Sequence, residues 1–255
     1  MSFRVMMKSV AVVVATLLAV SVPLLARAVT LNATGPVRWV GSRASHLWSC
    51  SLCWILGIRI RTVGGRPSGR TFLVAANHVS YLDILVLGSL QPTHFVAKSE
   101  IRGWPMFGWI SRAAGTLFVD RDNPRDAVRA IREMRGMLAD GISITLFPEG
   151  GTGSGDVVRP FQAALLEPAA RAGIPCFGAS VSYDTSGFPL PPSETIVWAN
   201  GKHFVSHFTR IMAIPRIDAT INVSEGPVSS EDRKELARKL WEHVQGTFVP
   251  VRTEA

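Results

Sequence analysis

Residues 9–26 limit most strongly how this chain can fold, because they form eighteen consecutive positions without a charged side chain. A helix of that length extends roughly 27 Å, just enough to cross the hydrocarbon core of a bilayer. Three interpretations compete. The segment is a single uncleaved anchor, a signal peptide cleaved near the small-x-small sequence at 26–28, or a helix that enters the membrane and returns with a partner around residues 39–58.

Basic residues dominate the first third of the chain. Residues 1–82 hold nine Arg or Lys and no Asp or Glu, a charge of +9, whereas the other 18 Arg or Lys and 19 Asp or Glu give −1. Such a segment attracts nucleic acid or anionic lipid. Three tryptophans lie among the arginines, as is typical of a membrane interface, and no nucleic-acid recognition motif is present. We therefore expect contact with membrane lipids and no nucleic-acid partner.

The same pattern divides the chain into two parts. We expect an N-terminal membrane anchor with a basic interfacial segment at residues 1–58, and a folded domain at residues 59–255. The arginines that follow the apolar stretch favour the cytoplasmic side of the inner membrane for the folded domain, by the positive-inside rule.

From residue 71 onward, strand and helix patterns alternate. This alternation predicts an α/β domain with helices covering a sheet. Asn123, Pro124 and Gly141 have the residue types that begin and end a helix. A second helix is expected from Ser229 to about Val244, where Ser229 with Asp232 could form the N-terminal cap. Short apolar runs predict strands at residues 72–76, 94–97, 116–119, 142–147 and 174–182, with further candidates at 195–199 and 217–223.

His78 and Asp83 follow the first of these predicted strands. A histidine can take a hydroxyl proton near neutral pH, and a carboxylate one helical turn away can fix its tautomer. The sequence has no G-x-S-x-G nucleophile motif, so in this interpretation the substrate supplies the attacking hydroxyl. A capping or core histidine, with Asp83 simply favouring the first helical turn, explains the spacing equally well.

Residues 147–155 form a glycine-rich loop after another predicted strand. Such a loop can present backbone N–H groups to an anion, although the P-loop pattern is absent and an ordinary flexible loop has the same composition. Lys98 and Arg121 follow neighbouring strands and could each pair with a phosphate or remain solvated.

Two further features have plain interpretations. Cys50 and Cys53 form a CxxC pair without a second pair, so we interpret them as reduced thiols and expect no metal site. His203 and His207 are interpreted as surface or interface residues.

Taken together, these motifs resemble the lysophosphatidate acyltransferase family, the phospholipid/glycerol acyltransferases. The sequence 77–83 resembles the family's N-H-x-x-x-x-D block, 115–121 its G-x-x-F-[IV]-D-R block, 147–150 the start of F-P-E-G-T-R-S, and 174–181, loosely, its V-P-V-x-P-V block. The resemblance covers roughly residues 60–225. It implies a glycerolipid-acyltransferase-like fold, in which helices cover a mixed sheet.

The resemblance also implies the chemistry. An acyl-CoA or acyl-carrier-protein donor would serve as co-substrate, without a further cofactor, and a lysophospholipid would be the acceptor. His78 would act as base with Asp83 as its partner. The acceptor head group would be held by residues of the later blocks and by a phosphate-binding lysine: Lys98, Arg121, Glu149, Gly150, Gly151 and Thr152. A cytoplasmic donor favours the uncleaved anchor among the three interpretations of the apolar segment.

One departure from the family pattern concerns the acceptor. Gly151-Thr152-Gly153 stands where many members have Thr-Arg-Ser, so the expected arginine is missing. An arginine fork is a strong recognition element for phosphate. We expect acylation of 1-acylglycerol-3-phosphate to phosphatidate, with lyso-ornithine lipid as the alternative acceptor. A catalytically silent membrane-binding protein is the alternative of another class, and a hydrolase is disfavoured because the nucleophile motif is absent.

Overall fold

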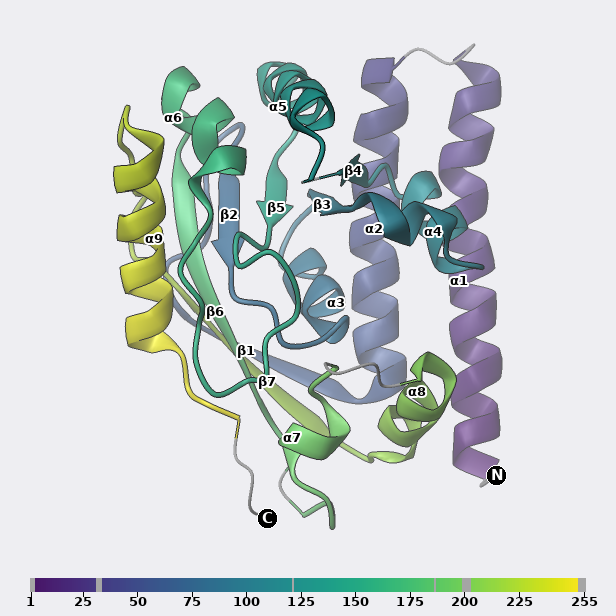
Figure 1. The fold of residues 1–255 in the computed structure, drawn as a ribbon. Helices are drawn as coiled ribbons and strands as arrows, with labels where there is room; N and C mark the ends of the chain where they lie inside the picture. Colours follow the sequence, from purple (N-terminus) through teal and green to yellow (C-terminus); the bar gives the residue numbers. More distant parts are fainter. Residues whose placement is uncertain (1–2, 31–33, 121, 186, 199–202, 252–255) are drawn as a thin grey trace.

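A computed structural model describes residues 3–30, 34–120, 122–185, 187–198 and 203–251. Within them, seven strands form one sheet in the order β1-β7-β6-β2-β5-β3-β4 (Figure 1). The β6–β7 pair is antiparallel and the other neighbouring pairs are parallel, so the predicted mixed sheet is confirmed. The strands are β1 Ile58–Gly64, β2 Leu73–Ala76, β3 His94–Lys98, β4 Leu117–Val119, β5 Ile144–Leu146, β6 Cys176–Asp184 and β7 Ile217–Val223.

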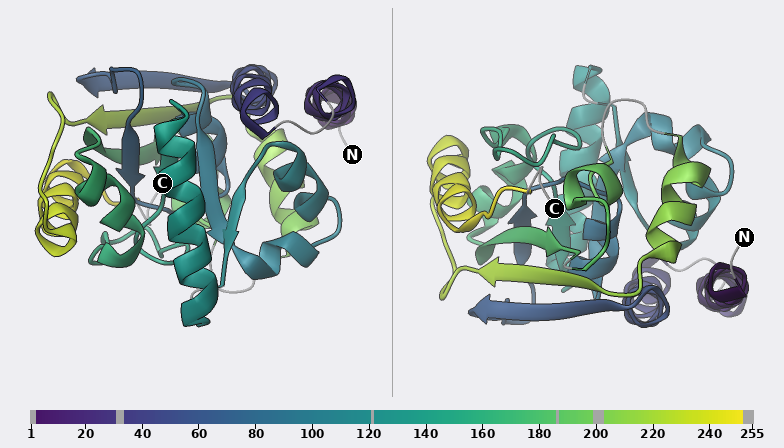
Figure 2. Two further views of the ribbon diagram at one scale, coloured as in Figure 1. Left: turned by 90° about the horizontal axis from the view of Figure 1, so that it is seen from above. Right: turned by 90° about the horizontal axis from the view of Figure 1, so that it is seen from below.

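Helices pack around this sheet. They are α1 Phe3–Val29, α2 Thr34–Leu56, α3 Leu82–Gly88, α4 Phe107–Ala113, α5 Pro124–Ala139, α6 Glu167–Ala172, α7 Pro192–Thr195, α8 Phe204–Ala213 and α9 Arg233–Thr247, with short 3₁₀ turns η1 Ser99–Gly103 and η2 Ala163–Leu166. Helix α9 packs against β6 on one side of the molecule, whereas α1 lies farthest out on the other side, with α2 next to it (Figure 2). The predicted α/β class is therefore confirmed.

Local sequence signals account for several helix ends. The Asn123 side chain accepts hydrogen bonds from the amides of Arg125 and Asp126, and Pro124 opens α5 as predicted. Asp232 caps α9 in the same way. The strand expected at 195–199 was wrong: α7 ends at Thr195 and is followed by irregular backbone, and residue 199 lies outside the described residues.

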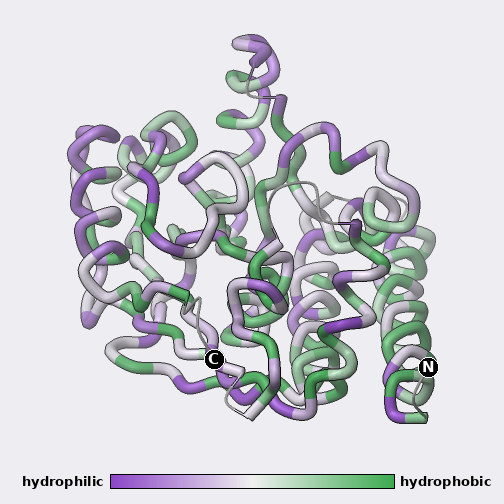
Figure 3. The backbone as a smooth tube through the Cα atoms, turned by 60° about the horizontal axis from the view of Figure 1, so that its bottom comes forward, coloured by the Kyte–Doolittle hydropathy of each residue, from purple (hydrophilic) through white to green (hydrophobic). Residues whose placement is uncertain are grey.

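Helices α1 and α2 run antiparallel side by side (Figure 1). Helix α1 is long and apolar enough to cross a membrane by length and composition, and Figure 3 shows its mostly hydrophobic sequence. Most of its apolar side chains are exposed. Its Lys8 ammonium donates hydrogen bonds to the carbonyls of Leu56 (2.9 Å) and Ile214 (3.1 Å). These two carbonyls lie at the C-terminal ends of α2 and α8, so Lys8 joins three helices. The helix pair is the arrangement required by the third interpretation of the apolar segment.

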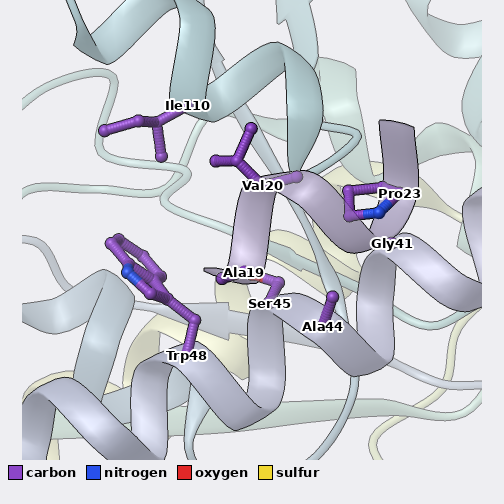
Figure 4. A pocket seen from close by; sticks show the side chains of 9 residues that line it. Ala19, Val20, Pro23, Gly41, Ala44, Ser45, Trp48 and Ile110 are labelled. Atoms are coloured by element: carbon purple, nitrogen blue, oxygen red, sulfur yellow. The ribbon is translucent and has the colours of Figure 1, made fainter. Parts of the chain in front are cut away.

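Small side chains let α1 and α2 approach α4 closely. A small apolar pocket lies between the three helices, and Figure 4 shows its lining. Gly41 and Ala44 come from α2, Ala19 from α1, and Ile110 from α4, with Trp48 at one side. Small residues at such contacts allow close packing of helix backbones. The hairpin thus packs against α4 as well as meeting the rest of the fold at the Lys8 contacts.

Candidate active site

The predicted functional segments meet at one edge of the sheet. Strands β2, β5, β3 and β4 are mutually parallel, so their C-terminal ends lie on the same side. His78 follows β2, Glu149 follows β5, and Lys98 ends β3. In open α/β sheets, ligands bind outside the carboxyl ends of the strands. The topology therefore brings together blocks that are far apart in the sequence.

Asn77 explains how the first block is fixed. Its side-chain carbonyl accepts a hydrogen bond from the amide of Val181 (2.7 Å), and its side-chain amide donates to the carbonyl of the same residue (3.0 Å). Asn77 thus continues the β2–β6 pairing through its side chain, one residue beyond β2. The backbone is then free to turn, and His78 leaves the sheet at a defined point.

His78 and Asp83 form the pair that the spacing predicted. The imidazole Nδ1 lies 2.8 Å from Asp83 Oδ2, and the His78 side chain is 16% exposed whereas that of Asp83 is fully buried. The His78 ring also stacks on Phe147, with ring centroids 4.0 Å apart. Because Nδ1 faces the carboxylate, it carries the proton of the neutral tautomer. The opposite nitrogen, Nε2, is therefore the one able to accept a substrate proton.

The carboxylate of Asp83 is held by more than the histidine. Its Oδ2 also accepts hydrogen bonds from the amides of Val79 (2.7 Å) and Ser80 (2.9 Å), and Oδ1 accepts one from the Tyr183 hydroxyl (2.7 Å). Burial, together with the adjacent carboxylate, raises the pKa of Tyr183, so its hydroxyl remains a donor. These donors compensate for the loss of water around a buried carboxylate. Asp83 therefore holds the turn that precedes α3 and orients the His78 ring, and the catalytic role of the pair stays a prediction.

Glu149 connects the histidine segment to the glycine-rich loop. Its Oε1 accepts a hydrogen bond from the backbone amide of His78 (2.7 Å), and Oε2 accepts one from the amide of Arg159 (2.9 Å). The Glu149 side chain is only 2% exposed. In this state its carboxylate fixes the backbone around the site, and its predicted contact with an acceptor head group stays a prediction.

The glycine-rich loop is partly closed on itself. The amide of Gly153 donates to the carbonyl of His78 (2.6 Å), and that of Gly150, a residue with φ +91°, donates to the carbonyl of Phe147 (3.3 Å). Two of the amides expected to face an anion are therefore used within the fold. Those of Gly151 and Thr152 donate to no backbone carbonyl among the described residues.

Arg159, like Tyr183, is a residue of this site that the sequence did not reveal. One terminal nitrogen of its guanidinium donates to the carbonyl of Gly151, and Nε lies 3.4 Å from Glu149 Oε2. It is the first basic residue after the loop, but no known motif marks it.

Comparisons with known proteins agree with this geometry. Residues 58–182 match the acyltransferase family model. The chain is 34% identical to a lyso-ornithine lipid O-acyltransferase from Pseudomonas aeruginosa, over 83% of this chain and 82% of the relative. It is 38% identical to a 1-acyl-sn-glycerol-3-phosphate acyltransferase from Neisseria gonorrhoeae, over 74% of each chain.

The chain belongs to the acyltransferase family. Its fold is also similar to that of the 1-acyl-sn-glycerophosphate (LPA) acyltransferase PlsC from Thermotoga maritima, with a TM-score of 0.61 and 19% identity over 94% of this chain and 95% of the other. Both the family and the fold expected from the sequence motifs are confirmed.

Of the two basic residues predicted to bind phosphate in this acyltransferase, the structure describes one. Lys98 ends β3 with an exposed side chain, and it pairs in register with Val119 of β4. Arg121 lies outside the described residues. Because β4 is parallel to β3, the chain after Val119 leaves the sheet at the same edge as Lys98. The roles of both residues as phosphate ligands stay predictions.

Aromatic side chains pack against the segment 78–83 of the acyltransferase, which carries His78 and Asp83. The Tyr81 hydroxyl lies 2.9 Å from His207 Nδ1, and the Tyr81 ring packs edge-on against Trp198 at 5.4 Å. The amide of Trp198 donates to the carbonyl of Val79 (2.9 Å). His207 is only 4% exposed, so its interpretation as a surface residue was wrong: α8 folds back over the motif and buries it.

Proposed function

We propose that this acyltransferase moves a fatty-acyl group from a thioester donor to the free hydroxyl of a lysolipid, with His78 as general base. The observation that carries the proposal is the His78–Asp83 pair, in which a buried, hydrogen-bonded carboxylate fixes the imidazole. The geometry leaves Nε2 as the basic nitrogen. No protein nucleophile is needed, because the acceptor brings its own hydroxyl.

The proposed reaction has a simple balance of atoms. His78 Nε2 removes the proton of the acceptor hydroxyl while its oxygen attacks the thioester carbonyl. The tetrahedral intermediate collapses, the C–S bond breaks, and the imidazolium returns its proton to the leaving thiolate. Asp83 stabilises the imidazolium through Nδ1 and remains ionised. The products are a diacylated lipid and a free thiol.

The proposed donor is acyl-CoA or acyl-carrier protein, and the proposed reaction uses no further cofactor or metal. Both donors carry the acyl group on a pantetheine thiol. They are cytoplasmic, which supports a catalytic domain on the cytoplasmic side of the inner membrane, attached through α1 and α2.

For the acceptor, we place lyso-ornithine lipid first and lysophosphatidate second, the reverse of the order expected from sequence alone. Two observations support this order. The loop amides of Gly150 and Gly153 are used within the fold, which leaves fewer donors for a doubly charged phosphate. The relative from Pseudomonas aeruginosa, aligned over 83% of this chain, is named for lyso-ornithine lipid. Lysophosphatidate stays the second candidate, because the relative from Neisseria gonorrhoeae is named for it.

An acceptor panel tests the proposal. The protein is reconstituted in liposomes and incubated with labelled acyl-CoA or acyl-carrier protein, together with lyso-ornithine lipid, lysophosphatidate or lysophosphatidylcholine. The expected result is label on lyso-ornithine lipid, with a lower rate or none on lysophosphatidate. Preference for lysophosphatidate would reverse the order of acceptors. No transfer to any lysolipid with either donor would contradict the activity and support a silent membrane-binding protein.

A further inference from the structure

Arg159 occupies a position that the family motif does not explain. It follows the glycine-rich loop by several residues, yet its guanidinium returns to the loop and contacts the carbonyl of Gly151. Its Nε lies 3.4 Å from the buried carboxylate of Glu149. The loop lacks the arginine of the family pattern, and the structure places a different arginine beside the same segment.

An internal ion pair does not account for this arginine. The Glu149 carboxylate already accepts hydrogen bonds from two backbone amides, those of His78 and Arg159 itself, and both remain when the Arg159 side chain is changed. The Nε contact at 3.4 Å is long for a charge-assisted hydrogen bond. The Arg159 side chain is 46% exposed, whereas that of Glu149 is 2% exposed. A guanidinium has five N–H donors, so most of those on Arg159 remain available to a ligand.

The position of Arg159 relative to the base is fixed. Glu149 bridges the backbone amides of His78 and Arg159 through its two oxygens, and Gly153 donates to the carbonyl of His78. The backbone positions that carry the imidazole and the guanidinium are therefore joined through one carboxylate, that of Glu149. A lipid that places a hydroxyl at His78 would place its head group over the loop.

We propose that Arg159 is the residue that binds the oxyanion of the acceptor head group, replacing the arginine missing from the loop. The ligand chemistry is a carboxylate or a phosphate, because a guanidinium binds either through paired N–H donors. The inference rests on the proposed function, and it names the residue that determines which acceptors are used.

Steady-state kinetics with three variants test the assignment. Arg159→Ala is expected to raise KM for the charged acceptor about 10- to 100-fold, as loss of a hydrogen-bonded charge does, with kcat and the donor KM within a few-fold of wild type. Arg159→Lys should recover much of the loss. Arg159→Gln keeps a donor for the Gly151 carbonyl but no charge, and should behave like the alanine variant.

Arg135→Ala is the matched control. Arg135 is 51% exposed and pairs with Glu167, much as Arg159 is 46% exposed and pairs with Glu149, but it lies on α5. This variant should retain the wild-type KM for every acceptor. An equal rise in KM for Arg135→Ala would overturn the assignment, because a general change in surface charge would then explain the effect.

Three acceptors separate the sources of the oxyanion: lyso-ornithine lipid offers a carboxylate, lysophosphatidate a phosphate, and monoacylglycerol neither. The Arg159→Ala defect should appear with the charged acceptors that wild type uses and be absent with monoacylglycerol. Rescue by glutamine, or an equal loss on all acceptors, would assign Arg159 a structural role and overturn the inference. If the wild-type protein transfers no acyl group, the proposed function is contradicted. If wild type and variants are active but the Arg159 variants keep the wild-type KM, only the role of Arg159 is contradicted.

Discussion

His78 is the residue on which the proposed chemistry depends most directly. His78→Ala removes the base while leaving the Asp83 carboxylate with its backbone donors and Tyr183, so the local fold should persist. We expect acyl transfer to fall about 10²- to 10⁴-fold. The initial rate in liposomes measures this, and circular dichroism with thermal unfolding checks the fold. Activity within a few-fold of wild type would rule out His78 as the base.

Tyr183 offers a finer test of the same pair, because it touches Asp83 and not the reacting atoms. Tyr183→Phe removes one donor from the carboxylate, which concentrates its negative charge on the oxygen facing His78. The buried carboxylate is then held by fewer hydrogen bonds and positions the imidazole less firmly, so kcat/KM should fall about 3- to 30-fold.

The measurement is kcat/KM in liposomes, with Asp83→Asn as a reference that should lose far more activity because tautomer control disappears. A kcat/KM for Tyr183→Phe equal to that of wild type would show that the hydroxyl contributes only to packing.

Sequence reasoning found some residues of this site and missed others for a physical reason. His78 and Asp83 are five positions apart and belong to one turn, so their spacing already indicated the pair. Tyr183 is 100 positions from Asp83 and reaches it only because β6 pairs with β2. Arg159 was missed because its contact depends on the path of an irregular loop, for which no periodic pattern exists.

At the scale of secondary-structure elements, His94 couples α2 to the sheet. Its Nε2 lies 2.9 Å from the carbonyl of Arg38, and a Cβ on Gly115 would approach its ring at 2.4 Å, so the glycine makes room for it. Burial lowers the pKa of His94 in the folded protein. The unfolded chain therefore binds a proton more readily than the folded chain.

This difference predicts a pH-dependent stability. Neutral His94 contributes fully to the free energy of unfolding above its pKa in the unfolded chain, about 6.5. As the pH falls below that value, the contribution decreases by up to about 1.4 kcal/mol per pH unit. His94→Gln should lower overall stability but flatten its decline between pH 7 and pH 5. Thermal unfolding in detergent at several pH values measures the slope. An identical slope in wild type and variant would contradict the assignment. Burial also lowers the pKa of His243, but this residue is present in both proteins and so does not contribute to the difference between their slopes.

Most elements could be predicted because their apolar runs are buried on both faces, as in β2 and β5. Strand β1 was not predicted. It alternates apolar residues with Arg59 and Arg61 at the edge of the sheet, and this basic composition resembled an interfacial segment. The strand forms because β7 offers a parallel partner along all seven residues, a tertiary contact that no local pattern records.

At the scale of the whole molecule, the N-terminal hairpin covers part of the core, and we propose that it also attaches the protein to the membrane. Deletion of residues 1–57 preserves β1 but uncovers α3, which α2 contacts, and removes the buried side chains of Leu52 and Leu56. We expect this truncated protein to lose membrane association and to aggregate unless detergent is present. Sedimentation with and without liposomes measures both effects.

A second truncation separates these two roles. Deletion of residues 1–30 leaves α2 over α3 and should weaken membrane association with less aggregation. Full retention of either truncated protein on liposomes would place the attachment in the body of the protein.

The Lys8 contacts have a consequence for which lysolipids can reach His78. Because one ammonium caps the ends of α2 and α8, α1 cannot slide along the domain without breaking hydrogen bonds at two other helices. With α1 embedded in lipid, the imidazole of His78 is then held at a constant depth relative to the head groups. We therefore expect a lysolipid hydroxyl to react only at a matching depth, so that the length of the linker between acyl chain and hydroxyl would select substrates before any head group is recognised.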